Sequence, residues 1–336
     1  MLEKTIKSVL NKKINHWIGT ITDDAVRNAI RKDLIITGGC FTSMIQNEPV
    51  NDFDCYFRTK ETVLLVANYY AKLWNSKRDP GGTVTGIGDY AYLMVLDGAN
   101  PSEELLKFYD IEKLEDCQSR MIANTPPDRV KMIFPSDGAV GDPEHANNNE
   151  ELGLFSVNEI VKELDNIPSN ELEKTDTPQY FPVFVSTNAI TLSNDIQIVV
   201  RFYGEPAEIH DTYDYEHTKA FYDYHNSTLS IPQRVYELVT NKTLVYTGSK
   251  YPVCSAFRMR KFIERGWKIN AGQILKMAMQ ISELDLMNID VFEDQLIGVD
   301  SLYFMNLIEQ FRRSKANNPN FELTPPYVIS IIDKIF

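Results

Sequence analysis

An apolar run, a glycine pair and two aspartates follow one another near the N-terminus, and their order limits what this part of the chain can fold into. Residues 34–37 read Leu-Ile-Ile-Thr, which is typical of a short buried strand, and Gly38-Gly39 follows it directly. Pro49 stops any helix that begins after the glycines. Residues 52–57 alternate polar and apolar side chains, which predicts another strand. The pattern therefore predicts a strand, a glycine turn, a short helix and a returning strand.

The rest of the chain divides into a mixed part and a helical part. Apolar residues recur at helical spacing over 1–33, as two helices, and over 61–74, and from residue 232 onward nearly all the periodicity is helical. We predict an α+β domain with a mixed sheet and flanking helices at 1–230, interrupted by an insertion at about 97–180, and an all-helical domain at 231–336. Further strands are expected at 91–96, 184–185, 189–192, 196–202, 213–222 and 229–231.

Composition excludes several classes of protein. The chain has 336 residues, 43% of them hydrophobic, which suits a globular protein of about two domains. Its formal net charge of -13 argues against a broad nucleic-acid-binding surface. No apolar stretch is long enough for a membrane helix, and the N-terminus has no signal core. The four cysteines form no metal-binding spacing, so we expect them to be reduced and the protein to be cytoplasmic.

Asp52 and Asp54 are the strongest candidates for chemistry. They are two residues apart on a predicted strand, so both carboxylates should point to one face. Two neighbouring carboxylates repel each other unless a cation lies between them, and Mg²⁺ prefers such oxygen ligands together with phosphate and water. A pair of this kind can hold two metal ions across a phosphoryl group. The sequence therefore predicts Mg²⁺, or Mn²⁺, at Asp52 and Asp54.

Gly38 and Gly39 are candidate phosphate-binding residues. A glycine pair between a strand and a helix lets backbone N–H groups approach a phosphate closely. The N-terminus of the following helix adds a partial positive charge. Twelve residues, 40–51, separate the glycines from Asp52. Each motif alone is common, but their order and spacing together are more specific.

This combination of Gly38-Gly39 and Asp52-Phe-Asp54 resembles the signature of the DNA polymerase beta nucleotidyltransferase superfamily, and most closely its CCA-adding enzyme and poly(A) polymerase branch. The segments 213–222 and 255–269 resemble two later motifs of that branch. The whole chain also resembles nucleotidyltransferase-like proteins of large tailed phages, which would act in the host cytoplasm.

The resemblance implies a template-independent transfer of a nucleoside monophosphate from a nucleoside triphosphate, such as ATP, to a hydroxyl group, with release of pyrophosphate. The acceptor would be an RNA 3′ end, such as that of a tRNA, a protein hydroxyl or a small molecule. The resemblance also implies a third metal-binding carboxylate from a neighbouring strand. Asp214 is the first candidate for it and Asp211 the second.

Further nucleotide-binding residues are implied by the same resemblance. Arg258 and Lys261 share one face of a predicted helix and would contact the base or its phosphate, although a solvated basic face is the alternative. Arg201 would neutralise phosphate or pair with Glu205. The branch usually has an arginine shortly after its glycine pair, and here Ser43 would bind phosphate instead.

These departures keep two alternatives open. The protein could be a catalytically silent member of the fold that serves as a binding or structural module. It could also be an antagonist that binds a nucleotide or a host factor without turnover. The intact Asp52 and Asp54 argue for the enzyme, because adjacent acids are costly to keep without a cation.

Overall fold

The computed structural model describes residues 3–76, 94–98, 100–101, 127–133, 139–140, 180–186, 188–296, 311, 314–315, 318 and 324–332. These residues form two compact units. The first comprises the described parts of Met1–Asn147, Ser156–Ile209 and Ala220–Ile231, and the second comprises His210–Lys219 and the described parts of Pro232–Phe336. The segment 210–219, which the sequence places in the first domain, thus belongs to the second unit. Most of the expected insertion at 97–180 lies outside the described residues.

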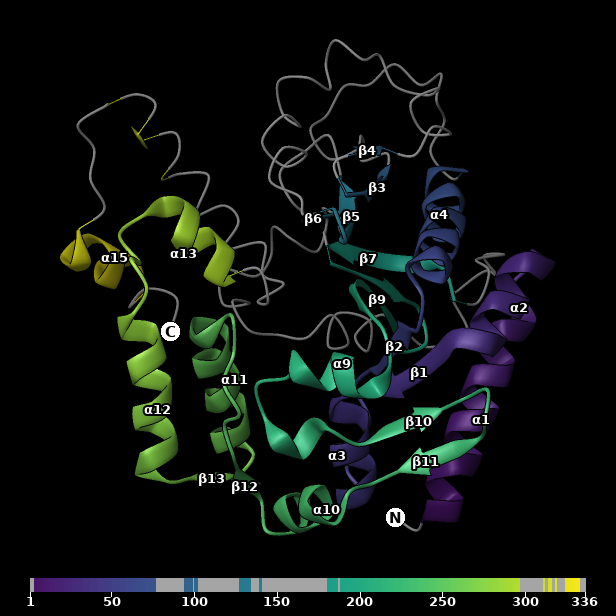
Figure 1. Ribbon diagram of the computed structural model, residues 1–336, viewed down its shortest axis with the longest axis horizontal. Helices are drawn as coiled ribbons and strands as arrows, with labels where there is room; N and C mark the ends of the chain where they lie inside the picture. Colours follow the sequence, from purple (N-terminus) through teal and green to yellow (C-terminus); the bar gives the residue numbers. More distant parts are fainter. Residues whose placement is uncertain are drawn as a thin grey trace, which may run out of the picture. The chain divides into compact units, whose positions relative to one another are not determined.

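A mixed sheet is the framework of the first unit (Figure 1). Within the described residues its strand order is β11-β10-β1-β2-β9-β8-β7-β6. β2 and β9 are parallel, and the other neighbours are antiparallel. Its strands are β1 Leu34–Thr37, β2 Phe53–Phe57, β6 Ala139–Val140, β7 Pro182–Ser186, β8 Ala189–Leu192, β9 Ile196–Tyr203, β10 Phe221–Asp223 and β11 Thr228–Ser230. A smaller sheet joins β3 Met94–Asp97, β4 Asn100–Pro101 and β5 Val130–Ile133. The predicted α+β class with a mixed sheet is confirmed.

This unit contains the helices α1 Glu3–Thr20, α2 Asp24–Asp33, α3 Gly39–Gln46 and α4 Lys60–Ser76. The short helix α9 Pro206–Asp211 begins in this unit and ends in the second. The Asp23 carboxylate caps α2 by accepting from the backbone N–H groups of the next turn. The Trp17 indole N–H donates to the Tyr70 hydroxyl over 2.7 Å, which ties α1 to α4.

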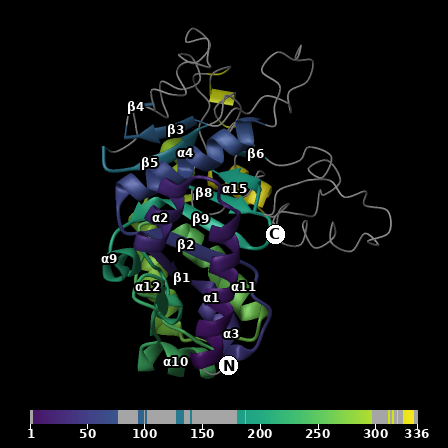
Figure 2. The ribbon, with the colours of Figure 1, turned by 90° about the vertical axis from the view of Figure 1, so that its right-hand side faces the viewer.

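The two faces of the sheet differ in polarity. The Tyr222 hydroxyl donates to Asn11 of α1, so the face that carries Tyr222 lies toward α1 (Figure 2). Ile36 and Cys55 are register neighbours on that face and are fully buried. Alternate residues point to the opposite face. That face carries the polar Thr37 and Asp54 together with the buried Ile35 and Tyr56.

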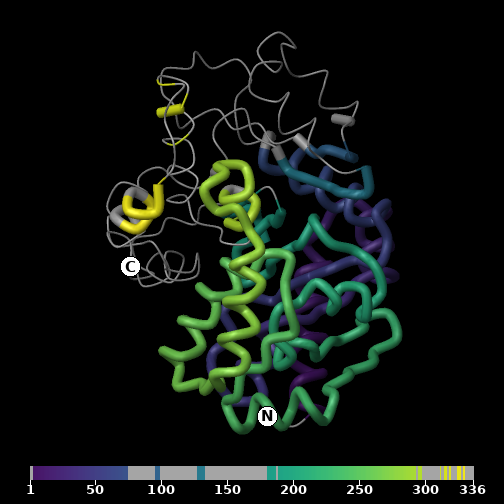
Figure 3. Tube along the Cα trace, turned by 60° about the vertical axis from the view of Figure 1, so that its left-hand side comes forward, coloured from purple at the N-terminus to yellow at the C-terminus, as the bar shows by residue number. Residues whose placement is uncertain are grey.

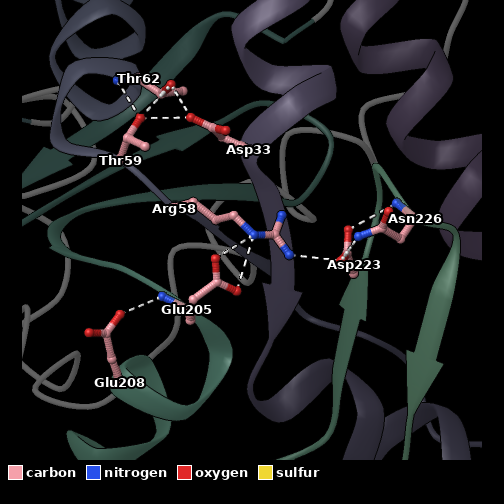
Figure 4. A network of polar contacts seen from close by, with 8 residues as sticks. All are labelled: Asp33, Arg58, Thr59, Thr62, Glu205, Glu208, Asp223 and Asn226. Atoms are coloured by element: carbon pink, nitrogen blue, oxygen red, sulfur yellow. Dashed lines mark hydrogen bonds and ion pairs between the residues drawn. The ribbon is translucent and has the colours of Figure 1, made fainter.

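A polar network fixes the far end of β2 (Figure 4). Arg58 donates to both carboxylate oxygens of Glu205, at 3.0 and 3.2 Å, and to Asp223 at 2.7 Å. Burial alone would raise the pKa of Asp223, but hydrogen bonds from Asn226 and Arg58 hold that pKa below its ordinary value. The network joins β2, the turn after β9 and β10. Glu205, which the sequence offered as a partner of Arg201, is therefore engaged by Arg58.

The second unit is mainly helical, and α11 and α12 pack against each other in it (Figure 3). It also contains a short parallel pair, β12 Thr243–Leu244 and β13 Lys268–Ile269, so the expectation of only helices after residue 231 is wrong. Its described helices are α10 Gln233–Thr240, α11 Pro252–Glu264, α12 Ala271–Ser282, α13 Ile289–Leu296 and α15 Pro325–Ile332. No helix among the residues described is long and apolar enough to cross a membrane.

The predicted strand at 213–222 is wrong over most of its length. Glu216–Thr218 forms a short 3-10 helix, and only the last residues of the segment enter β10. Tyr215 and His217 pack against Phe262 and Trp267, with His217 ring-centroid distances of 4.5 and 4.4 Å to those two rings. The aromatic residues of this segment form a ring cluster at a turn instead of a strand.

Candidate functional site

Gly38 and Asp54 are in close contact where β1 ends and α3 begins. Gly38 has φ 94° and ψ -153° and is the N-cap of α3. A Cβ at Gly38 would overlap the Asp54 carboxylate, with Cγ at 3.3 Å and the Asp54 Cβ at 3.5 Å. Thr37 and Asp54 are register partners across β1 and β2, which explains this approach. The structure therefore places the predicted glycine turn and Asp54 together.

Asp52 lies one residue before β2 and not on it, because the strand begins at Phe53. The two carboxylates were predicted to share one face of a strand, but only Asp54 lies on the strand. Asp52 still lies near the start of α3, because the charges of both carboxylates affect the pKa of the Cys40 thiol. Burial, followed by Asp54 and Asp52, raises the pKa of Cys40 well above its usual value. Both aspartates are half-buried, so both have access to solvent.

Gln197 is a neighbour of this site that the sequence analysis missed. It is the register partner of Asp54 on β9, and its side-chain amide donates to the Thr191 hydroxyl over 3.4 Å. Thr37, Asp54, Gln197 and Thr191 thus form a polar row across four strands of the sheet. A single polar residue in the apolar run Ile-Gln-Ile-Val-Val was the available signal.

Asp214 and Arg258 form an ion pair in the second unit. The Arg258 guanidinium is 2.6 Å from the Asp214 carboxylate, whose side chain is 10% exposed. The residue predicted as a third metal ligand is thus held by a residue predicted to bind nucleotide. Within the described ranges, no group of three or more His, Cys, Asp or Glu side chains is arranged to hold a metal ion. The role of Asp214 as a metal ligand stays a prediction.

The other predicted nucleotide-binding residues lie on several elements. Ser43 is in the second turn of α3 and is buried. Arg201 is buried in β9, with its guanidinium carbon 5.2 Å from the Phe202 ring centroid. Lys261 is exposed on α11, one helical turn from Arg258. Asp211, the second choice for a third carboxylate, ends α9.

The side chains around Gly38 suit a divalent cation bound together with phosphate. Asp52 and Asp54 supply hard oxygen donors, and Mg²⁺ in proteins commonly takes one or two carboxylates and completes its shell with water and phosphate. Because Gly38 has no side chain, the Asp54 carboxylate lies directly against the backbone at the start of α3. A helix N-terminus attracts phosphate through its unpaired N–H groups. The donor set therefore fits the predicted cofactor.

Comparison with known families gives a match over most of the chain. The model of the Gad2 family, described as Gabija anti-defense 2 family protein, matches residues 8–242. Comparison with curated proteins and with solved structures gives no significant match. The matched region includes the whole of the site built around Gly38, Asp52 and Asp54.

The family match corrects the assignment made from the motifs. The glycine pair and the two aspartates were taken as a resemblance to the DNA polymerase beta superfamily, and to its CCA-adding enzyme and poly(A) polymerase branch. That family assignment is wrong, because the matching family is Gad2. The local motif is compatible with either family, since its geometry depends on a few residues around one turn.

Proposed function

Since the chain belongs to the Gabija anti-defense 2 family, we propose that it counteracts the Gabija defence, in the host cytoplasm, and does so as an enzyme. The proposed reaction is transfer of a nucleoside monophosphate from a nucleoside triphosphate to a hydroxyl acceptor. An RNA 3′ end is the first acceptor to test, and a component of the defence is the second.

The proposal depends on one observation, the approach of the Asp54 carboxylate to the Gly38 backbone at the start of α3. A carboxylate is itself favoured beside a helix N-terminus, but it would repel a phosphate bound to the same N–H groups. A divalent cation between them removes that conflict. Asp52 and Asp54 would hold Mg²⁺ or Mn²⁺, which supplies charge neutralisation at the phosphates when bound.

The chain's own groups have distinct tasks in this reaction. The backbone of Gly38 and Gly39 and the first turn of α3 would bind the phosphates. The acceptor hydroxyl oxygen forms a bond to the α-phosphorus while the bond to the bridging oxygen breaks. Pyrophosphate leaves with that electron pair, and the hydroxyl proton passes to water. Arg201, Arg258 and Lys261 remain candidates for binding the nucleotide, and Asp214 for a third carboxylate.

The first test measures pyrophosphate release from ATP, CTP, GTP and UTP with Mg²⁺ or Mn²⁺, with and without total RNA. Asp52→Asn and Asp54→Asn are compared with Asp24→Asn, a control at a carboxylate that is 82% exposed at the start of α2. We expect release by the wild type and by the control, and a loss of at least about 100-fold in each site variant. Equal release by all four proteins would refute this site.

A second test measures the biological effect directly. Cells that carry the Gabija defence are infected with a sensitive phage while they express each variant. We expect the wild type and Asp24→Asn to restore phage growth and Asp54→Asn to fail. Restoration by a folded Asp54→Asn protein would show that turnover is not required.

The ion pair between Asp214 and Arg258 favours a second candidate, a module that binds its target without turnover. A carboxylate engaged by a guanidinium is a poorer metal ligand, so the site would have only two of the three expected acids. In that case the family's anti-defence effect would persist in Asp52→Asn and Asp54→Asn, and no triphosphate would release pyrophosphate.

A further inference from the structure

A polar pocket of about 380 Å³ lies entirely within the second unit. It is lined by the loop 247–250 and by Asp211, Tyr213, Lys219 and Gln280. We propose that this pocket is a binding site for the phosphate group of a phosphorylated ligand. The proposal does not depend on chemistry at Asp52 and Asp54, which belong to the first unit.

The loop presents backbone donors that no acceptor among the described residues engages. The preceding amides are engaged, since the Tyr246 N–H donates to Gln273 at 2.8 Å and the Thr247 N–H donates to the Asp214 carbonyl at 2.9 Å. Among the residues described, the N–H groups of 248–250 find no acceptor. Gly248 has φ +112°, a conformation that favours glycine. Successive free N–H groups on a turn of this kind are a common binding site for phosphate oxygens.

Side chains add donors to the same pocket. A Cβ at Gly248 would lie 3.7 Å from the side-chain nitrogen of Gln280, so this amide faces the loop. The Gln280 oxygen accepts from the Tyr246 hydroxyl at 2.6 Å, which directs the NH₂ group toward the pocket. The Ser249 hydroxyl accepts from the Tyr251 N–H at 2.9 Å and keeps its own proton to donate. The polar lining is therefore rich in donors.

The charges favour an anion, in a chain whose net charge is -13. The charged residues of the lining are Lys219, Lys250 and Asp211, which are two cations and one carboxylate. Lys219 also pairs with Glu216 at 3.1 Å, so Lys250 is the more available cation. The Lys276 ammonium donates to the Thr247 carbonyl oxygen over 3.1 Å, so this negative group of the loop is already engaged. Lys276 itself lies outside the pocket lining.

Phosphate suits this arrangement better than a carboxylate does. Its several oxygens can accept from the loop N–H groups and from Lys250 at once, whereas a carboxylate has only two. The pocket is also larger than a single phosphate ion needs, which points to a phosphate ester or a polyphosphate chain. A nucleoside triphosphate and an inorganic polyphosphate share this chemistry, so both are used as probes.

The test uses the full chain with Asp52→Asn and Asp54→Asn as background, in EDTA, so that metal-bound nucleotide at the first unit does not contribute. Titration calorimetry measures the affinity for ATP and for tripolyphosphate. We expect Lys250→Gln to weaken binding about tenfold, because one charge-assisted contact is lost. We expect Asp211→Asn to strengthen it severalfold, because the one repelling carboxylate is removed. Lys268→Gln, an exposed lysine of β13 outside the pocket, is the control and should bind as the background does.

The outcomes are separable. Tighter binding of ATP than of tripolyphosphate, with both variant effects, supports a nucleotide ligand, and equal binding supports a polyphosphate chain. An absence of binding at millimolar concentrations would overturn the proposal. So would an equal effect of Lys250→Gln and Lys268→Gln, since that would reflect only the overall charge. Lys219→Gln is a second pocket variant, and its affinity should also fall.

Discussion

Substitution of Gly38 is the sharpest test of the site, because its neighbour provides a matched control. Gly38→Ala places a methyl group at φ 94° and ψ -153°, a region that glycine occupies almost alone. The backbone cost there is about 1–3 kcal/mol. The same methyl group would overlap the Asp54 carboxylate, so Asp54 must also move.

Gly39→Ala makes the same chemical change one residue later. Gly39 is the first residue of α3, and a Cβ there would have no atom within 4 Å. Alanine should therefore be neutral or stabilising by up to about 1 kcal/mol, since it reduces the freedom of the unfolded chain. We expect the two variants to differ by about 2–4 kcal/mol in the free energy of unfolding.

Urea denaturation followed by circular dichroism measures this difference, and pyrophosphate release measures its effect on the site. A double variant, Gly38→Ala/Asp54→Ala, separates the two contributions, because it removes the overlap and leaves the backbone cost. Equal stabilities of Gly38→Ala and Gly39→Ala would refute the reasoning. So would a double variant that recovers none of the loss, because the carboxylate would then not be in contact with Gly38.

Two further predictions concern pH. Asp223→Asn should lower the free energy of unfolding by about 2 kcal/mol near pH 6, because it breaks the charge-assisted contact with Arg58. The pKa of Asp223 is lowered in the folded state, so this difference should shrink as the pH falls below about 4 in urea titrations, and a constant difference would contradict it. Burial lowers the pKa of His217 from an ordinary 6.5 to about 3. As the pH drops below about 6.5, the unfolded state therefore binds a proton before the folded state does, and the free energy of unfolding falls. His217→Phe should remove a slope of up to about 1.4 kcal/mol per pH unit between pH 6 and 4, and parallel curves for the two proteins would argue against the buried neutral imidazole. His210, whose pKa burial also lowers to about 4, titrates in both proteins and cancels in the comparison.

Local signals in the sequence were enough for the elements around the site. The run Leu34–Thr37 is β1 within the predicted bounds, because four apolar or β-branched residues are closed by a glycine that α3 needs as its N-cap. The second helix expected within 1–33 is α2, and Asp23 opens it because the Asp23 carboxylate accepts from the first N–H groups. These features depend on neighbours within a few residues, which a single sequence displays.

Features that depend on distant residues were not visible in the sequence. Asp214 and Arg258 are 44 residues apart and join different elements, so nothing local indicates their ion pair. The aromatic residues around Tyr215 suggested a strand, but contacts with Phe262 and Trp267 decide their conformation. Gln197 became part of the site through its register with Asp54, which only the assembled sheet defines.

The same distinction explains why the motif predicted geometry better than family. A strand that ends in glycine beside a returning strand can bring a carboxylate onto the glycine backbone in any chain with that connection, because only sterics are required. Family membership depends instead on the whole matched region, residues 8–242 here. The contact between Gly38 and Asp54 is therefore not a mark of one family. The reaction must accordingly be tested on the residues of this site, and anti-defence activity must be tested separately, because a variant such as Asp54→Asn can lose one and keep the other.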